Sequence, residues 1–303
     1  MHWFFISLIA PFLYALTNHI DKLLLEKYFK SRGVHTLLLI SALLSGVAIP
    51  IFFIQAPDAI YLPIQTIFIM CTVGLMNLVV LWLYLLALNE DEASVVIVFY
   101  QLVPVFGLIL GYYLLQETLS SIELLAMAIV LIGTTIISFE IDSDNHFKVK
   151  LRTAFLMVGA SFVWALSSVI LKMVSLEEGV PASLFWEHVT LFFVGILLLI
   201  FVKKFRQALK ETFSVISKPI LTINIGNEIL YMIGNWVFAF SYLLAPIALI
   251  LIMNSFQPIF VFIIGILLTL FAPTLGTEKI SLINISQKLV AIVITGIGTY
   301  LLL

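Results

Sequence analysis

Ten long apolar runs dominate this chain of 303 residues and restrict its fold more than any other feature. A helix needs about 20 such residues to cross the hydrocarbon core of a bilayer, where backbone groups cannot be left without hydrogen bonds. We therefore predict an all-α polytopic membrane protein with transmembrane helices at residues 3–22, 34–55, 64–88, 93–115, 121–139, 153–174, 181–202, 219–243, 246–271 and 283–303.

Composition supports a lipid environment and argues against several classes of partner. Hydrophobic residues make up 62% of the chain and charged residues only 11%, whereas about 25% is usual in a soluble domain. The net charge of −2 argues against a nucleic-acid partner, which requires a basic face. A single cysteine, Cys71, can form neither a disulfide framework nor a cysteine metal site. No cofactor or metal is expected.

A short stretch near the start of the chain returns after 150 residues. Residues 14–22 (YALTNHIDK) correspond to residues 164–172 (WALSSVILK), and two further pairs recur at a spacing of 154, namely Trp82 with Trp236 and Pro104 with Pro258. We interpret this as a tandem duplication, with five-helix repeats at 1–140 and 153–303 joined by a linker at 141–152. Because five is odd, the repeats must cross the membrane in opposite directions, as inverted repeats around a central cavity.

With the segment from Gly111 to Glu117 (GYYLLQE) and the Leu131–Gly133 step, these stretches resemble the EamA family of the drug/metabolite transporter superfamily. The resemblance is to the ten-helix form with two EamA repeats. It implies a basket of helices in a cell membrane, such as a bacterial inner membrane, that exports or exchanges a small metabolite by alternating access. The second half departs from this pattern, since an insertion at 272–285 replaces any clear equivalent of Glu117.

A polar stripe in the eighth run is the strongest candidate for a substrate site. Asn224, Glu228, Tyr231 and Asn235 recur at spacings of four, three and four, which places them on one helical face. Because an ionisable side chain is costly in lipid, this face is expected to meet the cavity or another helix. Two interpretations remain open: a structural hydrogen-bond network, or substrate binding with protons as the coupling ion.

The duplicated stretches and the proline-containing runs supply further candidates for the same site. Proline frees a backbone carbonyl one turn earlier, and such openings often line cavities in membrane helices, although a simple packing kink is the alternative. These candidates are Tyr14, Asn18, Tyr100, Gln101, Trp164, Asn254 and Gln257.

Two pairs of ionisable residues complete the set. Glu187 and His188 could relay a proton or form a polar pair at the membrane interface, and because neighbours on a helix point about 100° apart, only one should face the cavity squarely. Lys22 and Lys172 occupy equivalent positions in the duplicated stretches. They could gate opposite ends of the cavity, or they could simply extend to the headgroups.

These features favour a secondary transporter, as a monomer or homodimer, over two other classes. A membrane-embedded lipid-modifying enzyme built on Glu187, His188 and Glu228 would lack a recognisable pair of nucleophile and base. A non-transporting scaffold would have no need of a polar stripe at mid-membrane depth. No H-E-x-x-H, G-x-S-x-G or P-loop motif is present, so no catalytic residue is predicted.

Loop charge predicts the orientation of the chain. Apart from Lys22 and Lys172, every basic residue falls near the loops that follow the first, fifth, seventh and ninth runs. Because basic loops stay cytoplasmic, both termini are predicted to face outward, whereas the family resemblance suggests the reverse. The basic loop at 203–218 is expected to be either an amphipathic helix on the membrane surface or a solvated loop.

Overall fold

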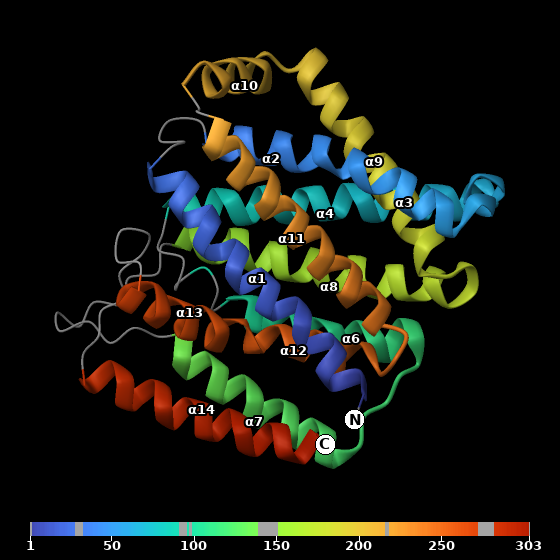
Figure 1. Cartoon of the computed structure of the whole chain (residues 1–303). Helices are drawn as coiled ribbons and strands as arrows, with labels where there is room; N and C mark the ends of the chain where they lie inside the picture. Colours follow the sequence, from blue (N-terminus) through green and yellow to red (C-terminus); the bar gives the residue numbers. More distant parts are fainter. Residues whose placement is uncertain are drawn as a thin grey trace.

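The computed structural model describes residues 2–27, 33–90, 96, 99–138, 151–215, 218–271 and 282–302, and these contain helices but no strands (Figure 1). The first half comprises α1 (His2–Lys27), α2 (Gly33–Leu44), η1 (Ser45–Val47), α3 (Ala48–Gln55), η2 (Pro57–Tyr61), α4 (Ile64–Glu90), η3 (Phe99–Gln101), α6 (Leu102–Leu115) and α7 (Ser121–Ser138). The second half comprises α8 (Leu151–Glu178), α9 (Val180–Phe201), α10 (Lys203–Val215), α11 (Lys218–Ser241), α12 (Ile247–Met253), η4 (Asn254–Phe256), α13 (Gln257–Phe271) and α14 (Leu282–Leu302).

Within the described residues the apolar runs coincide with helices, which confirms a multi-pass helical membrane protein, while residues 93–95 and 97–98 of the fourth run lie outside the described part of the chain. Within the described residues, six segments are long and apolar enough to cross a membrane, and three shorter apolar helices accompany them. The six are His2–Leu24, Gly33–Gln55, Ile64–Glu90, Leu151–Glu178, Val180–Phe201 and Ile247–Phe271. The helix α11 is long enough but is not among them, which we attribute to its three asparagines and one glutamate. Ten spans and inverted repeats remain predictions.

Prolines explain the breaks in three of the predicted runs. A proline removes the hydrogen bond to the carbonyl four residues earlier and crowds that carbonyl. For Pro50, Pro104 and Pro258 these carbonyls belong to Gly46, Tyr100 and Asn254, which lie in η1, η3 and η4. Each helix therefore tightens into a 3₁₀ turn just ahead of its proline.

The two halves pack together through their long helices. α1 lies along α11, and α8 lies along α4, so the first helix of each predicted repeat meets a helix from the middle of the other (Figure 1). α7 and α14 form a separate close pair. Gly133 permits that approach, because a Cβ there would lie 2.8 Å from the backbone nitrogen of Thr295.

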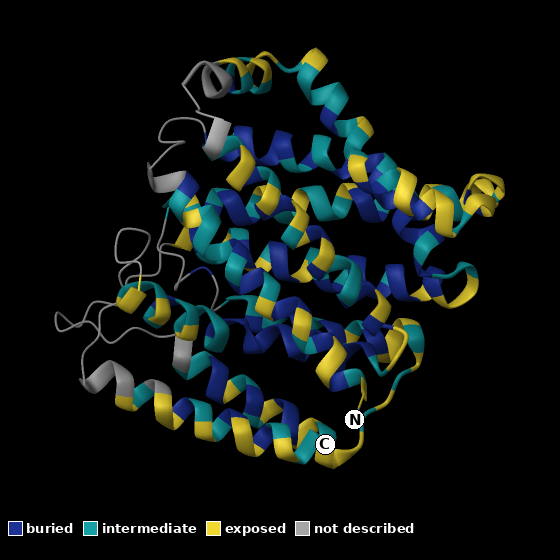
Figure 2. Cartoon of the chain, in the orientation of Figure 1, coloured by how far each residue is buried: buried dark blue, intermediate teal, exposed yellow. Residues whose placement is uncertain are grey.

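The surface and the ends of the bundle agree with a lipid setting. Large apolar side chains such as Phe68, Phe155 and Phe193 are exposed, as lipid tails would allow. Figure 2 shows exposed positions recurring along the helices of the bundle. Both chain termini lie at the same end of the bundle (Figure 1).

The basic segment after α9 is helical rather than an irregular loop, since it forms α10, and Phe205 of this helix packs edge-on against His35 of α2.

Candidate substrate site

A cavity of about 130 Å³ lies among α1, α2, α4, α9 and α11, with further walls from η3, α8 and α13. Three carboxyl groups line it, those of Asp21, Glu187 and Glu228. None of the described residues that line it is a lysine or an arginine. The cavity is therefore an acidic space between helices of both predicted repeats.

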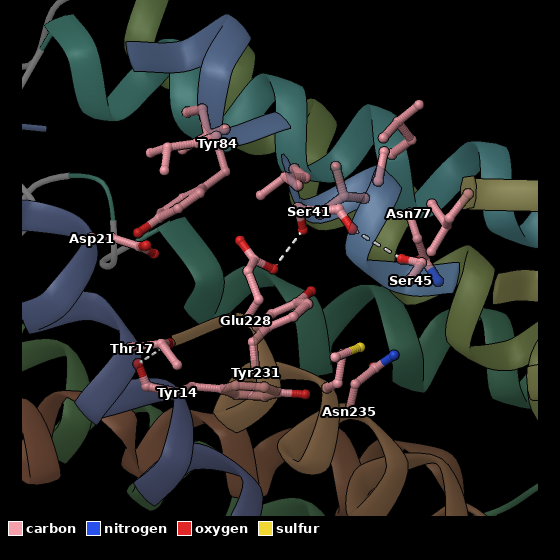
Figure 3. Close-up of a pocket in the computed structure, with 18 of the residues that line it drawn as sticks. Tyr14, Thr17, Asp21, Ser41, Ser45, Asn77, Tyr84, Glu228, Tyr231 and Asn235 are labelled. Atoms are coloured by element: carbon pink, nitrogen blue, oxygen red, sulfur yellow. Dashed lines mark hydrogen bonds between the residues drawn. The ribbon is translucent and has the colours of Figure 1, made fainter. Parts of the chain in front are cut away.

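Glu228 reaches this cavity from α11 as the helical spacing predicted. Its side chain is 8% exposed, and Ser41 of α2 donates a hydrogen bond of 2.8 Å to its Oε2 atom (Figure 3). Tyr231 and Asn235, one and two turns further along, also line the cavity. The stripe thus turns a polar face towards the space between the two halves.

Glu187 reaches the cavity from α9 and is held by Asn77 of α4. The Asn77 amide nitrogen donates to Glu187 Oε1 at 2.8 Å, and the Asn77 Oδ1 accepts a hydrogen bond of 2.9 Å from Ser167 of α8. Gly74, one turn before Asn77, lets α4 approach closely, because a Cβ there would lie 2.9 Å from the Glu187 carbonyl oxygen. Glu187 itself is 1% exposed, and its Oε2 has no hydrogen-bond partner.

Asp21 is the third carboxyl group, and sequence reasoning missed it together with its partner Asn227. The Asn227 amide nitrogen donates to Asp21 Oδ1 at 2.7 Å, while the Asn227 Oδ1 has no partner. A signal was available, since Tyr14, Asn18 and Asp21 are spaced by four and three residues and share a face of α1.

Aromatic side chains form much of the remaining wall. The rings of Tyr14 and Tyr231 lie 5.5 Å apart, and Tyr100 lies 5.8 Å from Tyr84 in a stacked pair. Trp164 meets Tyr100 edge-on at 5.1 Å. The Tyr84 hydroxyl donates to Asn18 Oδ1 at 3.3 Å. Figure 3 shows Tyr84 and Tyr231 on either side of the Glu228 side chain.

His188 also lines the cavity, although helix geometry predicted that only one member of the Glu187–His188 pair would face it squarely. Its Nδ1 lies 2.8 Å from the Leu184 carbonyl oxygen, which can only accept, so Nδ1 carries the proton. Its Nε2 accepts a hydrogen bond of 3.4 Å from the Trp236 indole. Both ring nitrogens are thus engaged, unlike the free oxygen of Glu187.

The structure does not place every candidate at the cavity. Asn224 and Asn254 are buried outside its lining, and Gln101 instead accepts a hydrogen bond of 3.1 Å from Thr134. Lys22 lies on the exposed side of α1 and is not part of the lining. The remaining candidates that do line the cavity are Tyr14, Asn18, Tyr100, Trp164, Tyr231, Asn235 and Gln257.

Lys172 is buried and belongs to a different cluster. Its Nζ lies 2.5 Å from Glu117 Oε1 and donates a hydrogen bond of 2.7 Å to the Ala245 carbonyl oxygen. The other Glu117 oxygen accepts a hydrogen bond of 2.6 Å from the backbone nitrogen of Ile247, at the start of α12. We call Lys172, Glu117, Ala245 and Ile247 the end cluster. It joins the ends of α6 and α8 to the turn between α11 and α12, at the right of Figure 1.

Within the described residues, no group of three or more His, Cys, Asp and Glu side chains is arranged to hold a metal ion. The three cavity carboxyl groups are instead held separately, by Asn227, Asn77 and Ser41. The three carboxyl groups line one cavity but do not converge on a single position, so they are better arranged to surround a molecule than to coordinate one ion.

Comparisons with known proteins give a family match over the first half of the chain and a shared fold over almost all of it. Residues 1–139 match the model of the EamA-like transporter family, which confirms the resemblance seen in the sequence. No curated protein matches the chain. Among 27 matching chains of solved structures, one described only as a crystal structure of a protein has a TM-score of 0.69 at 12% identity. The match covers 99% of this chain and 94% of that one, so the two share a fold.

Proposed function

We propose, from the premise that residues 1–139 belong to the EamA-like transporter family, that the protein is a secondary transporter of a small metabolite. It would export or exchange this metabolite by alternating access around the acidic cavity. The observation that carries the proposal is the cavity itself, because helices of both halves bring buried carboxyl, amide and aromatic side chains to one space. Polar groups in membrane helices usually mark such a pathway.

The unbalanced charge of the cavity suggests how transport is driven. Burying ionised carboxyl groups without a partner costs several kcal/mol each, so Asp21, Glu187 and Glu228 need protons or a bound cation. Protons would therefore be the coupling ion, bound at these carboxyl groups when the site is empty of cations. We take Glu228 as central, since it lines the same cavity as Asp21 of α1 and Glu187 of α9 and belongs to the polar stripe of α11.

The end cluster would act as the gate at one end of the cavity. Alternating access requires contacts that close one side and open in the other state. The Lys172–Glu117 ion pair joins the two halves, and its partners at the α11–α12 turn would move apart when that end opens. Lys22 has no comparable partner network among the contacts described, and its gating role remains a prediction.

Transport by the purified protein in lipid vesicles tests the proposal. Vesicles preloaded with single members of a metabolite panel should accumulate the matching labelled metabolite by exchange, and Glu228→Gln should lower this exchange roughly 100-fold. Glu177→Gln removes the same charge from an exposed position at the end of α8 and should leave it intact. Failure of every metabolite to exchange would contradict a transporter. A covalent change in the vesicle lipid would favour a membrane-embedded lipid-modifying enzyme.

A further inference from the structure

We infer that the cavity selects a small organic cation whose ammonium group carries N–H donors, in preference to neutral or anionic molecules of the same size. This inference rests on the proposed transport function and names the class of its substrate. Three independent features of the cavity carry it: its charge, its unfilled hydrogen-bonding atoms, and its aromatic walls.

The charge of the lining is one-sided. Asp21, Glu187 and Glu228 contribute three carboxyl groups, and no lysine or arginine among the described residues lines the space. The two lysines of the duplicated stretches do not line it, because Lys22 is exposed on α1 and Lys172 is paired with Glu117. An anionic solute would meet only repulsion here, whereas a cation would replace the missing counter-charge.

Of the three fully buried lining atoms without a hydrogen-bond partner among the described residues, two are acceptors. Glu187 Oε2 and Asn227 Oδ1 have no hydrogen-bond partner, although their side chains are only 1% and 3% exposed. Asn235 lies near Glu187 but forms no hydrogen bond of acceptable geometry with Oε2. Among the buried side-chain atoms described, only one unfilled donor, the Asn18 amide, belongs to the same lining. Because buried polar groups are normally satisfied, these acceptors call for a ligand that donates hydrogen bonds.

The walls and the volume define the rest of the ligand. The faces of Tyr14, Tyr100, Tyr231 and Trp164 can attract an ammonium group through their π-electrons and can cover an apolar body. The cavity volume of about 130 Å³ is close to the ~150 Å³ of an engineered cavity that binds benzene. A compact amine of a few carbon atoms therefore fits this conformation.

Binding of a matched series of probes to the purified full chain in detergent tests the inference. The probes are n-butylamine, n-butanol, butyrate, tetramethylammonium and sodium ion, with ionic strength held constant. Butylamine should bind at least about tenfold more tightly than butanol, since charge-assisted hydrogen bonds are roughly twice as strong as neutral ones. Butyrate should not bind. Tetramethylammonium should bind more weakly than butylamine, because it cannot donate to the free acceptors.

Single substitutions test which carboxyl groups cause the preference for butylamine over butanol. Glu187→Gln and Glu228→Gln should each weaken butylamine binding about tenfold and leave butanol binding unchanged, whereas Glu177→Gln should change neither. Equal binding of butylamine and butanol would overturn the inference, and so would tighter binding of butyrate or sodium. Equal binding of tetramethylammonium would overturn the role of the free acceptors. If vesicles exchange a neutral or anionic metabolite, transport stands and the inference fails. If butylamine binds but no solute is exchanged, the inference about the ligand stands and the transport proposal fails.

Discussion

The cavity and the end cluster both bury ionisable groups, but they differ in how those groups are satisfied. In the end cluster, Lys172 and Glu117 form an ion pair, and the Ala245 carbonyl and the Ile247 amide satisfy further atoms of the pair. In the cavity, the donors to the three carboxyl groups among the described residues are the neutral side chains of Ser41, Asn77 and Asn227, and the buried Glu187 Oε2 has no described partner. A charge that is balanced within the protein holds structure together, and a charge left unbalanced in a cavity is available to a solute.

The largest effect that this comparison predicts is at Glu228. Glu228→Gln keeps the shape of the side chain and removes its charge. A cation bound in the cavity would then lose one partner of a buried charge pair, which costs about 2–5 kcal/mol, so metabolite exchange should fall roughly 100-fold. Uptake in vesicles between pH 5 and 8, together with size-exclusion profiles, measures this. Uptake at the wild-type rate across that range would reduce Glu228 to a structural residue.

Substitutions in the end cluster should lower the free energy of unfolding and should alter transport unequally from the two sides of the membrane. Glu117→Gln leaves buried Lys172 without its counter-charge and should cost about 2–3 kcal/mol of stability, less than a fully buried pair because the Glu117 side chain is 20% exposed. The double variant with Lys172→Met should be less destabilised than the sum of the single variants. Thermal unfolding of the four proteins gives this coupling, and additive losses would show that the ion pair contributes nothing.

A smaller effect is expected at the support of Glu187. Asn77→Ala removes the hydrogen bond that orients Glu187 Oε1, which should cost about 1–2 kcal/mol and raise KM for exchange roughly tenfold. Thr72→Ala on the same helix, whose hydroxyl bonds only its own helix at Phe68, is the matched control. Equal kinetics in the two variants would mean that Glu187 needs no positioning.

The smallest effect is expected at Lys22. Because its side chain is exposed and outside the cavity lining, Lys22→Met should change stability by less than about 0.5 kcal/mol and exchange by no more than about twofold. Lys172→Met, at the equivalent position of the duplicated stretch, should have a far larger effect. Comparing the two variants in exchange from either side of the vesicle measures the asymmetry, and equal losses would restore a pair of equivalent gates.

Much of this architecture is readable in the sequence because lipid imposes length and apolarity on each helix. The predicted run at 219–243 differs from α11 by only one residue at its start, and the run at 246–271 contains α12, η4 and α13. Helical spacing within one run also places Glu228, Tyr231 and Asn235 together, and all three lie at the cavity. Orientation relative to the membrane rests on loop charge alone and stays a prediction.

Contacts between helices could not be read in the same way. Nothing in the spacing near Lys172 points to Glu117, which lies 55 residues earlier and meets it only because α6 and α8 end side by side. Asp21 was missed for the same reason, since its role depends on Asn227 of α11. Lys22 and Lys172 occupy equivalent positions in the duplicated stretches but differ in burial, since Glu117 pairs with Lys172 and the described residues give Lys22 no ion pair.

Proton release on ligand binding tests most directly whether the cavity carboxyl groups alternate between protons and a cation. Butylammonium chloride, adjusted to the pH of the sample and added to the purified protein in weakly buffered detergent at neutral pH, should release protons from the cavity carboxyl groups into the solution, and Glu228→Gln should release fewer. Glu177→Gln should match the wild type. Butylamine binding without any release of protons, or equal release from the Glu228→Gln variant, would contradict the exchange of protons for a cation at this cavity.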